Sequence, residues 1–572
     1  MQVSKICNID NYRNLSGMKV NFNENINFIV GKNNTGKSNL LELLNILINT
    51  GKFYESDFHD VRAPIEVTFQ VKYTDDEVGY FEDNFDVDDK LQITVVAKQN
   101  SVDDRIEYYH KDSAAFISPK KIKGLNFIYY SSLRIPSKEL NFNRNLGTGK
   151  VLSYLMKESL KQESVEEVEL LDTSKINKVI KVLNGQIKKL NGLTNEKIEA
   201  YINNDNENLV NRIVEIGDDF KRNLNDLGDG IRYGFNIFLH ILELLVHLKT
   251  TTKEENYEKL MISMPNDKKY IPLILGLDEP EIHQHPYRQR ALIKSVQKII
   301  NNANQEFAEL LKELFGIDGF LGQVFVVTHS PNILLNEYKE IIRLHNQEGV
   351  VKATSGININ FDPKIHKHLI RSFAYIKEAM FSESVILVEG DTEFGAVPVF
   401  ASRMGHDIDE DGIGVIKLDG ADSVKRCLQL YRAFEIPVSA IIDKDKEASY
   451  MGERDVFFTT EIDFEEEVYS LYSLKEYMKY LIEVDKVRSL IRIFKQEIDQ
   501  FNVAEFLKNP TEYEIEGTIA EKIMTKIKDE QLQFLKKNKT AVNGALLSTY
   551  VNEVPSCFKS VIENALRGKL NE

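Results

Sequence analysis

Cysteine is scarce in this sequence of 572 residues, and its three copies, Cys7, Cys427 and Cys557, lie far apart. An odd number without Cys-x-x-Cys or Cys/His spacing excludes a disulfide framework and a structural zinc site, and predicts free thiols in a reducing compartment. Glycine (30 residues) and proline (13) are too few for a collagen-like or low-complexity chain. The hydrophobic fraction of 42% still suffices for packed cores, which excludes wholesale disorder.

Long apolar runs are missing too. The N-terminal segment MQVSKICNIDNYRN lacks the apolar core of a secretory signal. The most apolar stretch, Phe235 to Leu248, contains two histidines, an asparagine and a glutamate, and it is too short to span a bilayer. We therefore expect a soluble, cytoplasmic protein without membrane contact.

The charge is of predominantly one sign. Asp and Glu number 88 against 72 Lys and Arg, which gives a net charge of −16. This balance disfavours a chain that coats nucleic acid over its whole surface, but it leaves room for one local basic strip. Candidates for that strip are Lys120, Lys121, Lys123 and the cluster 536–539. At about 150 residues per domain, the length predicts three to four domains.

A phosphate-binding motif is present near the N-terminus. Residues 31–38, GKNNTGKS, fit GxxxxGK[ST], follow the apolar run Ile26 to Val30, and precede a leucine-rich helix predicted over 39–49. Backbone N–H groups of the loop would surround a phosphate, the Lys37 ammonium would contact its oxygens, and the Ser38 hydroxyl would bind Mg²⁺. The predicted ATP-binding residues are Gly31, Asn33, Asn34, Thr35, Gly36, Lys37 and Ser38. An ordinary glycine turn is the alternative.

A second acidic motif completes this prediction. The apolar run 273–277 leads into Asp278 and Glu279, the Walker B arrangement, in which the first acid holds Mg²⁺ through water and the second polarises the attacking water. Farther on, the run VFVVTHS ends near His329, which could touch the γ-phosphate. Taken alone, each has an ordinary alternative: an acidic turn for the first and a capping histidine for the second.

A further set of acids lies in the second half of the chain. Glu389 follows the apolar run 384–388, Glu393 comes four residues later, and Asp443 and Asp445 follow the apolar pair Ile441-Ile442. Carboxylates at the ends of adjacent strands converge on one crevice, and their oxygens are preferred ligands of Mg²⁺ and Mn²⁺. Two such metals about 4 Å apart can activate water and stabilise a leaving oxygen.

Two neighbouring segments could complete the acidic site. Asp463 and Glu465 follow the strand-like run VFFTT and could hold a second metal, although the same acids could simply begin a helix. Lys539, in the cluster 536–539, could neutralise charge in the transition state, although a solvated basic turn is the plainer alternative.

The spacing of the motifs suggests a relationship. The Walker A and Walker B motifs lie about 240 residues apart, which resembles ABC-type ATPases of the SMC, RecF and Rad50 kind. The segment 227–232, LGDGIR, resembles the degenerate signature of the overcoming-lysogenization-defect (OLD) family, so that Gly228 and Gly230 of a second protomer would contact the nucleotide. Gly228 stands where a serine often binds the γ-phosphate, which puts fast ATP turnover in doubt. Residues 11–14, NYRN, resemble the superfamily's first strand-turn, with a plain turn as the alternative.

A strand ending in glutamate, followed by a strand ending in DxD, is the Toprim pattern. An ATPase followed by a Toprim domain resembles OLD nucleases over nearly the whole chain, and VILVEGDTE, IIDKDK and TEIDFEEEVYS resemble the nuclease subunit of Gabija antiphage systems. The resemblance implies an α/β architecture in which an ABC-type ATPase (1–149 and 226–350) is interrupted by a helical insertion used for dimerisation (150–225). A linker (351–380) and a Toprim domain with a helical tail (381–572) would follow.

The same resemblance implies a function. It predicts an ATP-regulated, metal-dependent DNA endonuclease in antiphage defence, acting on double-stranded DNA as a dimer or tetramer, some relatives working beside a UvrD-like helicase. Glu389, Glu393, Asp443, Asp445, Asp463 and Glu465 would bind two Mg²⁺ or Mn²⁺ ions, and Lys539 would be the late catalytic lysine. The alternatives are an SMC/RecF-like repair ATPase with a structural Toprim half, and a topoisomerase- or primase-like enzyme. The missing Cys/His cluster argues against a primase.

Overall fold

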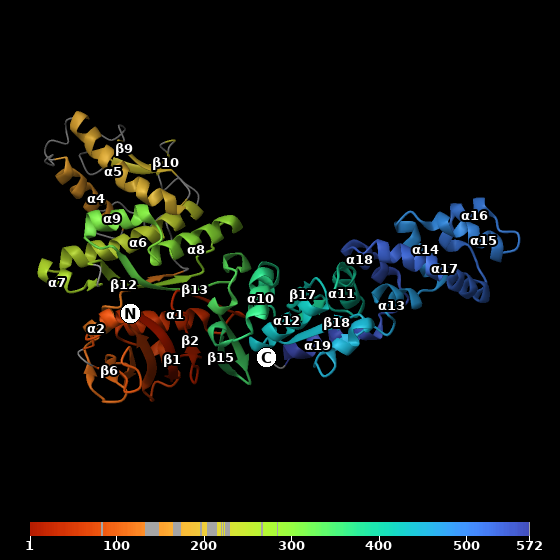
Figure 1. Ribbon diagram of the computed structural model, residues 1–572, viewed down its shortest axis with the longest axis horizontal. Coiled ribbons are helices and arrows are strands. Elements are labelled where there is room, and N and C mark those ends of the chain that lie inside the picture. Colours follow the sequence, from red (N-terminus) through yellow and green to blue (C-terminus); the bar gives the residue numbers. More distant parts are fainter. Residues whose placement is uncertain are drawn as a thin grey trace. The chain divides into compact units, whose positions relative to one another are not determined.

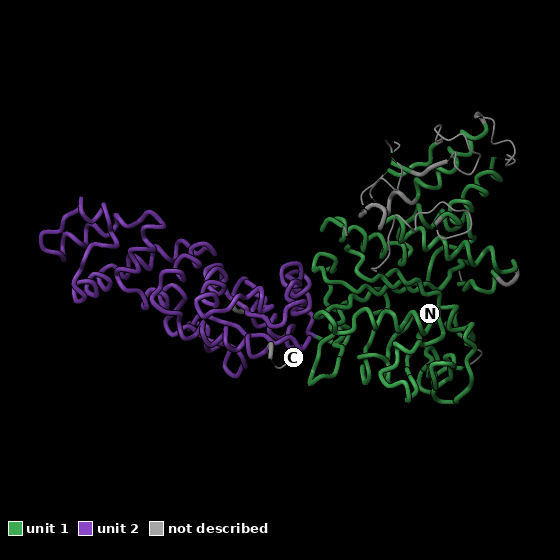
Figure 2. The backbone as a smooth tube through the Cα atoms, turned by 180° about the vertical axis from the view of Figure 1, so that it is seen from behind, with its two compact units in different colours: residues 1–360 green, residues 361–572 purple. Residues whose placement is uncertain are grey.

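The computed structural model describes residues 1–81, 84–131, 148–163, 173–194, 197–202, 214–218, 220, 222, 229–264, 267–282 and 284–570. The chain forms two compact units, Met1–Asn360 and Phe361–Glu572 (Figures 1 and 2). We describe each unit by itself.

The first unit contains an antiparallel sheet near its N-terminus. Its strand order is β2-β1-β4-β5-β6-β7. The strands are β1 (Gln2–Asp10), β2 (Val20–Asn21), β4 (Ile65–Lys72), β5 (Gln92–Gln99), β6 (Glu107–His110) and β7 (Phe116–Ile117). Alternate residues of β4 are buried, as the alternating sequence IEVTFQV predicts for a strand with one face on a core.

A second sheet, largely parallel, positions the nucleotide motifs. Its order is β11-β12-β13-β3-β14-β15, and β8 pairs with β12 on the side of that path. The strands are β3 (Ile26–Gly31), β8 (Phe127–Tyr130), β11 (Ile262–Ser263), β12 (Lys269–Asp278), β13 (Gly319–Val327), β14 (Ile341–Gln347) and β15 (Val350–Ser355). The continuous apolar runs of β3, β12 and β13 are buried almost throughout, as expected for parallel strands covered on both faces.

Helices cover this sheet and build the insertion. They are α1 (Lys37–Asn45), α2 (Pro119–Lys123), α4 (Thr148–Gln162), α5 (Thr173–Thr194), α6 (Asp229–Thr251), α7 (Glu254–Glu258), α8 (Pro286–Ile300) and α9 (Gln305–Phe315). The predicted helical insertion contains α4 and α5 but also an antiparallel pair, β9 (Ile198–Ile202) and β10 (Val214–Asp218), which the polar, lysine-rich sequence did not reveal. Whether this insertion dimerises the protein stays a prediction.

The stretch 351–380, predicted as a linker, is largely regular. Most of β15 and the helix α10 (Pro363–Ile376) occupy it. Asp362 caps α10 by accepting hydrogen bonds from the N–H groups of Lys364 and Ile365, and Pro363 occupies the first helical position, where its missing N–H costs nothing. Between the two elements, residue 361 begins the second unit.

The second unit is built on a parallel sheet with the order β17-β16-β18-β19. The strands are β16 (Ser384–Val388), β17 (Ile413–Lys417), β18 (Val438–Ile442) and β19 (Val456–Phe458). Helices connect and follow them: α11 (Asp391–Arg403), α12 (Ala421–Ala433), α13 (Phe464–Ser470), α14 (Leu474–Glu483), α15 (Ile491–Glu497), α16 (Val503–Lys508), α17 (Gly517–Lys537), α18 (Ala541–Tyr550) and α19 (Ser556–Leu570). The predicted helical tail is confirmed. No helix in the described part of the chain combines the length and apolarity needed to cross a membrane.

Candidate nucleotide and metal sites

The phosphate-binding motif forms the turn between β3 and α1. Gly36 precedes α1 with a φ of 89°, and a Cβ atom there would lie 2.6 Å from Leu15 Cδ2, so only glycine fits. Lys37 begins the helix and is buried, and its Nζ donates to the carbonyls of Gly31 (2.9 Å) and Lys32 (2.6 Å). Burial lowers the pKa of Lys37 to about 8. Of the predicted loop residues, Asn33 and Asn34 are exposed and Thr35 is buried.

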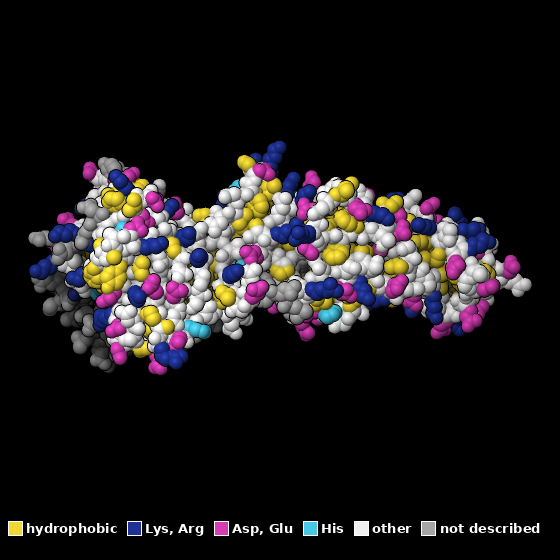
Figure 3. Space-filling model, turned by 90° about the horizontal axis from the view of Figure 1, so that it is seen from below, with side chains coloured by type: hydrophobic (Ala, Val, Ile, Leu, Met, Phe, Trp, Pro, Cys, Tyr) yellow, Lys and Arg dark blue, Asp and Glu magenta, His cyan; other side chains and the backbone are white. Residues whose placement is uncertain are grey.

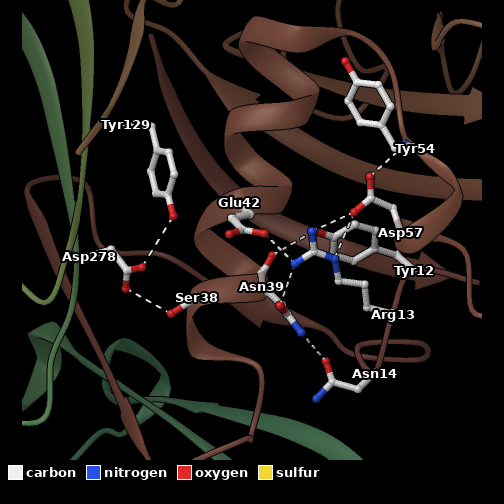
Figure 4. Close-up of polar contacts among 10 residues, drawn as sticks. All are labelled: Tyr12, Arg13, Asn14, Ser38, Asn39, Glu42, Tyr54, Asp57, Tyr129 and Asp278. Atoms are coloured by element: carbon white, nitrogen blue, oxygen red, sulfur yellow. Dashed lines mark hydrogen bonds and ion pairs between the residues drawn. The ribbon is translucent and has the colours of Figure 1, made fainter. Parts of the chain in front are cut away.

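The Walker B aspartate meets the same turn through the sheet. β13 lies between β3 and β12, and all three run parallel, so Asp278 at the end of β12 and Ser38 at the start of α1 share one edge. Ser38 Oγ donates to Asp278 Oδ1 (3.0 Å), and the Tyr129 hydroxyl donates to Oδ2 (3.4 Å; Figure 4). Burial raises the pKa of Asp278, and the Ser38 hydrogen bond opposes that rise. Sequence reasoning did not find Tyr129.

Glu279 and His329 also come together, as the sequence predicts. Glu279 adopts a φ of 49°, and its Oε1 lies 3.4 Å from His329 Nε2. Burial and the nearby Lys37 ammonium lower the pKa of His329. The loop that carries the histidine is held by Glu281, whose Oε1 accepts from Thr328 Oγ1 (2.7 Å) and from the His329 N–H (2.8 Å).

An arginine ties the first strand-turn to the same helix. Arg13, at a φ of 42°, donates from Nε and Nη2 to Asp57 Oδ1 (2.9 and 2.7 Å) and from Nη1 to Asn39 Oδ1 (2.7 Å). It also pairs with Glu42, and Asn39 Nδ2 donates to Asn14 Oδ1 (2.7 Å; Figure 4). Burial alone would lower the pKa of Arg13, but Tyr12 and the two carboxylate partners outweigh that effect, and the pKa is raised. The segment NYRN is therefore more than a plain turn.

The predicted signature segment is only partly visible. Gly228 lies outside the described residues, and Gly230 falls in the first turn of α6, where only the backbone is described. The predicted contact with a second protomer stays a prediction.

The second unit gathers the predicted carboxylates at one edge of its sheet. β16 and β18 are parallel neighbours, so Glu389 and Asp443, each directly after its strand, lie side by side. Glu393, in the first turn of α11, is buried with 5% of its surface exposed. Burial, with Glu465 adding repulsion, raises the pKa of Glu393 to about 7. Burial, with Glu393 and Glu389 adding repulsion, raises the pKa of Asp443 to about 8.

The acids after β19 join this cluster and also begin a helix, and whether they bind a metal stays a prediction. Asp463 caps α13 by accepting from the Glu466 N–H (3.0 Å), and its Oδ2 pairs with Lys536 Nζ (2.8 Å). Glu465 is fully buried, accepts from Thr392 Oγ1 (3.2 Å), and pairs through Oε2 with Lys539 Nζ (2.8 Å).

A close contact between two helices delivers Lys539 to this edge. α11 and α18 pack backbone to backbone: a Cβ on Gly395 would lie 1.8 Å from the Ala541 carbonyl, and one on Gly544 would lie 2.0 Å from the Thr392 carbonyl. Lys539 directly precedes Thr540, the cap of α18, so this contact fixes it beside Glu465. Burial lowers the pKa of Lys539, but the neighbouring carboxylates raise it by more, so the pKa is raised overall.

Asp445 differs from the other predicted ligands. Its side chain is 47% exposed and pairs with Lys446 (2.6 Å), its neighbour in the turn after Asp443. The structure thus gathers Glu389, Glu393, Asp443, Asp463, Glu465 and Lys539, and it turns Asp445 toward solvent.

The donor set suits hard divalent cations. Buried carboxylates that hold protons near neutral pH are groups that a cation would stabilise, and oxygen donors of this kind are preferred by Mg²⁺ and Mn²⁺. The described residues contain a tighter group, Asp86, His110 and Asp112, whose ligand atoms all lie within 4.8 Å of one another. Burial raises the pKa of Asp86, but hydrogen bonds from Gln92 and Thr94 outweigh it and lower the pKa. Those bonds already use the Asp86 oxygens, which marks a structural network.

Two family models match the chain. The AAA ATPase domain matches residues 1–141 and 68–334, together more than half of the chain. The Toprim domain of overcoming-lysogenization-defect-like proteins matches residues 380–445.

Two curated relatives and two solved structures are similar to parts of this chain. The chain is 24% identical to the Old nuclease of Escherichia phage P2 over 465 residues, covering 73% of each protein. It is 23% identical to endonuclease GajA of Bacillus cereus (strain HuB5-5) over 387 residues, which are 61% of this chain and half (50%) of that relative. The SMC head domain of Thermotoga maritima aligns at 13% identity and a TM-score of 0.30, covering 63% of this chain and 100% of that one. An SMC head bound to the winged-helix domain of ScpA aligns at 14% identity and a TM-score of 0.33, covering 62% and 98%.

Proposed function

Because the chain belongs to the AAA ATPase domain family over residues 1–334 and carries an OLD-like Toprim domain, we propose that it is a metal-dependent DNA endonuclease controlled by ATP. An ATPase domain joined to a Toprim nuclease domain is the arrangement that its homology to the Old nuclease and GajA supports. The carrying observation is the cluster of buried carboxylates at the ends of β16 and β18 beside Lys539.

At the nucleotide site, each residue has a distinct task. Lys37 exchanges its two backbone carbonyl partners for phosphate oxygens, which restores charge to a buried ammonium. Ser38 and Asp278 would hold the magnesium ion of the nucleotide. Glu279 accepts a proton from the attacking water, and His329 positions that glutamate.

At the Toprim edge, Glu389, Glu393, Asp443, Asp463 and Glu465 would hold two divalent cations. When bound, such cations supply Lewis-acid stabilisation of the charge that develops during phosphodiester hydrolysis. Thr392 fixes the orientation of Glu393 and Glu465 by contacting both carboxylates (3.2 Å each). Lys539 lies where an ammonium can neutralise a phosphate oxygen. Asp445 remains a proposed ligand at the outer part of this site, where its exposed side chain pairs with Lys446.

The wider setting is a further part of this proposal. We infer a role in antiphage defence, with double-stranded DNA as the substrate, in the cytoplasm. A homodimer or homotetramer would supply the segment 227–232 to the nucleotide of its neighbour, and a separately encoded UvrD-like helicase is a candidate partner.

The test is cleavage of supercoiled plasmid with Mg²⁺ or Mn²⁺, with and without ATP, by the wild type and by Glu389→Gln. We expect cleavage by the wild type and none by the variant, because Gln keeps the shape but loses the charge that holds a cation. The lanes with ATP give the sign of the control that the ATPase exerts.

Asp445→Asn is the informative companion variant. It removes an exposed carboxylate whose described contact is Lys446, so a loss of cleavage equal to that of Glu389→Gln would establish a direct role. Normal cutting by Glu389→Gln would refute the site. ATP hydrolysis without cleavage in every lane would favour a repair ATPase with a structural Toprim domain.

A further inference from the structure

Helix α8 has a charge composition unlike that of the chain as a whole. Its 15 residues, PYRQRALIKSVQKII, contain Arg288, Arg290, Lys294 and Lys298 and no acid, although the whole chain carries a net charge of −16. On the face of the molecule in Figure 3, by contrast, basic and acidic side chains are interspersed. The apolar face of α8 is buried through Leu292, Ile293, Val296, Ile299 and Ile300.

The opposite face of α8 carries a stripe of basic and aromatic side chains. Positions 287, 290, 294 and 298 are spaced three or four residues apart, so they lie on one side of the helix. Tyr287 is 72% exposed, the Arg290 guanidinium lies 5.0 Å from the centre of its ring, and the His285 ring stacks on it at 5.7 Å and 13°. Lys294 and Lys298 have no ion-pair partner among the residues that the structure describes.

A second helix of the same kind packs against α8. α5 contains Lys175, Lys178, Lys181, Lys188 and Lys189 and no acid. Lys178, Lys181 and Lys188 are exposed, whereas Lys189 pairs with Glu313 (2.8 Å). The four basic residues of α8 and the five of α5 therefore give nine positive charges without a negative one in two neighbouring helices.

We propose that α8, together with α5, is the surface on which the ATPase unit holds the DNA backbone. A row of lysine and arginine side chains about one helical turn apart suits a polymer with a phosphate at every nucleotide. The exposed Tyr287 ring, backed by His285, adds a platform on which an unpaired base can stack. A membrane would need apolar side chains on the exposed face, and Tyr287 is the one large hydrophobic exposed there. The choice of DNA rests on the proposed function.

Hydrogen bonds connect α8 to the loop that carries His329 at the nucleotide site. Gln289, the buried residue between Arg288 and Arg290, accepts from Ser330 Oγ (2.7 Å) and donates to the Gln284 carbonyl (2.9 Å). Ser330 follows His329, whose ring faces Glu279. DNA bound to α8 would therefore contact a helix that is hydrogen-bonded to the loop carrying His329. This connection would let DNA binding influence ATP hydrolysis.

The experiment compares two variants of the full chain that lose the same charge. Lys294→Gln/Lys298→Gln removes two charges from the stripe, and Lys90→Gln/Lys111→Gln removes two exposed lysines from the antiparallel-sheet region. Binding to a fluorescent duplex of mixed sequence is followed by anisotropy in EDTA, over a series of salt concentrations. For the first variant we expect affinity about ten-fold weaker and a salt slope smaller by about 2, since each phosphate contact contributes about 0.9. The second variant should match the wild type.

The outcomes separate this surface from the proposed function. Equal loss in both variants, or no loss in either, overturns the α8 surface while a wild type that binds and cuts DNA keeps the nuclease. A wild type that does not bind DNA at any salt concentration overturns both. Tyr287→Ala should weaken binding to single-stranded DNA more than to duplex. Stronger binding of the wild type to phosphatidylserine vesicles than to DNA, lost in the Lys294/Lys298 variant, would replace DNA by a membrane and overturn the proposal.

Discussion

The two candidate sites are electrostatic opposites built by the same device. Both lie at the carboxyl ends of parallel strands, where side chains from distant parts of the sequence meet. The first site contains a buried cation, Lys37, whose pKa burial lowers to about 8, beside one buried acid, Asp278. In the second unit the buried groups are acids, Glu393 and Asp443, whose pKa values burial raises to about 7 and about 8.

This difference indicates the charge of the ligand that each site favours. Burial without a full counter-charge destabilises the charged form, so each site is relieved by a ligand of opposite sign. An anion restores the charge of Lys37, and cations restore the charges of Glu393 and Asp443. The acidic site has two lysines nearby: Lys536 pairs with Asp463, and Lys539 pairs with Glu465. Asp443 and Glu393 therefore have the greater need for positive charge from a bound cation.

The largest expected effect comes from removing the cation of the first site. Lys37→Ala should weaken ATP binding at least about 100-fold, because charge-assisted hydrogen bonds to phosphate are lost in a buried setting. Binding of a fluorescent ATP analogue measures it, and Lys52→Ala, a lysine just beyond α1, is the control. Unchanged nucleotide affinity in Lys37→Ala would remove the phosphate site.

The second-largest effect is expected from a substitution of Asp443, which should lower activity but raise stability. Asp443→Asn should abolish cleavage yet stabilise the metal-free protein by about 1–3 kcal/mol at pH 9, since it removes a repelled, buried carboxylate. Burial raises the pKa of Asp443 to about 8, above its ordinary value of 3.8, so the contribution of this residue to stability is greatest in acid and falls as the pH rises from about 4 to about 8. The gain should therefore nearly vanish at pH 4. Urea unfolding with EDTA at the two pH values tests it, with Asp445→Asn as the exposed control.

The pH dependence of binding should run in opposite directions at the two sites. Metal binding must displace protons from both Glu393 and Asp443, so Mn²⁺ affinity should rise between pH 6 and 8, by up to about 100-fold per pH unit where both groups are protonated, and then level off. ATP binding needs a charged Lys37, so its affinity should fall above pH 8. Calorimetry in buffers of different ionisation enthalpy should show proton release with Mn²⁺ and proton uptake with ATP. Parallel trends at the two sites would break the comparison.

The smallest effect tests the outer contact of the Walker B aspartate. Tyr129→Phe removes one long hydrogen bond to Asp278 (3.4 Å) and keeps the ring, so ATP affinity should change less than about three-fold. Ser38→Ala, which removes the shorter contact (3.0 Å) and the expected magnesium ligand, should cost clearly more. An equal loss in both variants would assign Tyr129 a direct part in holding the nucleotide.

Much of the fold around the two sites could be predicted, because short segments of the sequence determine its strands, turns and helices. GKNNTGKS between an apolar run and a leucine-rich run specifies a strand, turn and helix locally, and each apolar run ending in an acid specifies a buried parallel strand. The order of the strands decides which ends meet, and the right-handed crossover of parallel strands restricts that order to few choices. The sequence could therefore predict that Lys37 lies near Asp278 and that Glu389 lies near Asp443.

The missed features depend on pairings that no short stretch contains. Arg13 meets Asp57 and Glu42 because a turn with positive φ aims it at α1. The strands β9 and β10 lie in a lysine- and asparagine-rich region where composition favours helices. Asp445 satisfies the DxD pattern in sequence, but a turn of 3₁₀ helix after Asp443 directs its side chain outward, toward Lys446. Patterns identify residue types, whereas backbone conformation decides where they point.

The contact between α11 and α18 has a consequence for biosynthesis. Lys539, α18 and α19 are translated after all of the clustered acids, yet α18 meets α11 at backbone distance and α19 packs on β16, β18 and β19. The sheet edge that carries Glu389 and Asp443 is therefore complete only after α19 has left the ribosome. A polypeptide interrupted between Glu465 and Lys539 would hold the acids but neither the lysine nor the covering helices. Translation thus completes the cluster of carboxylates and lysine only after the whole ATPase domain has been synthesised.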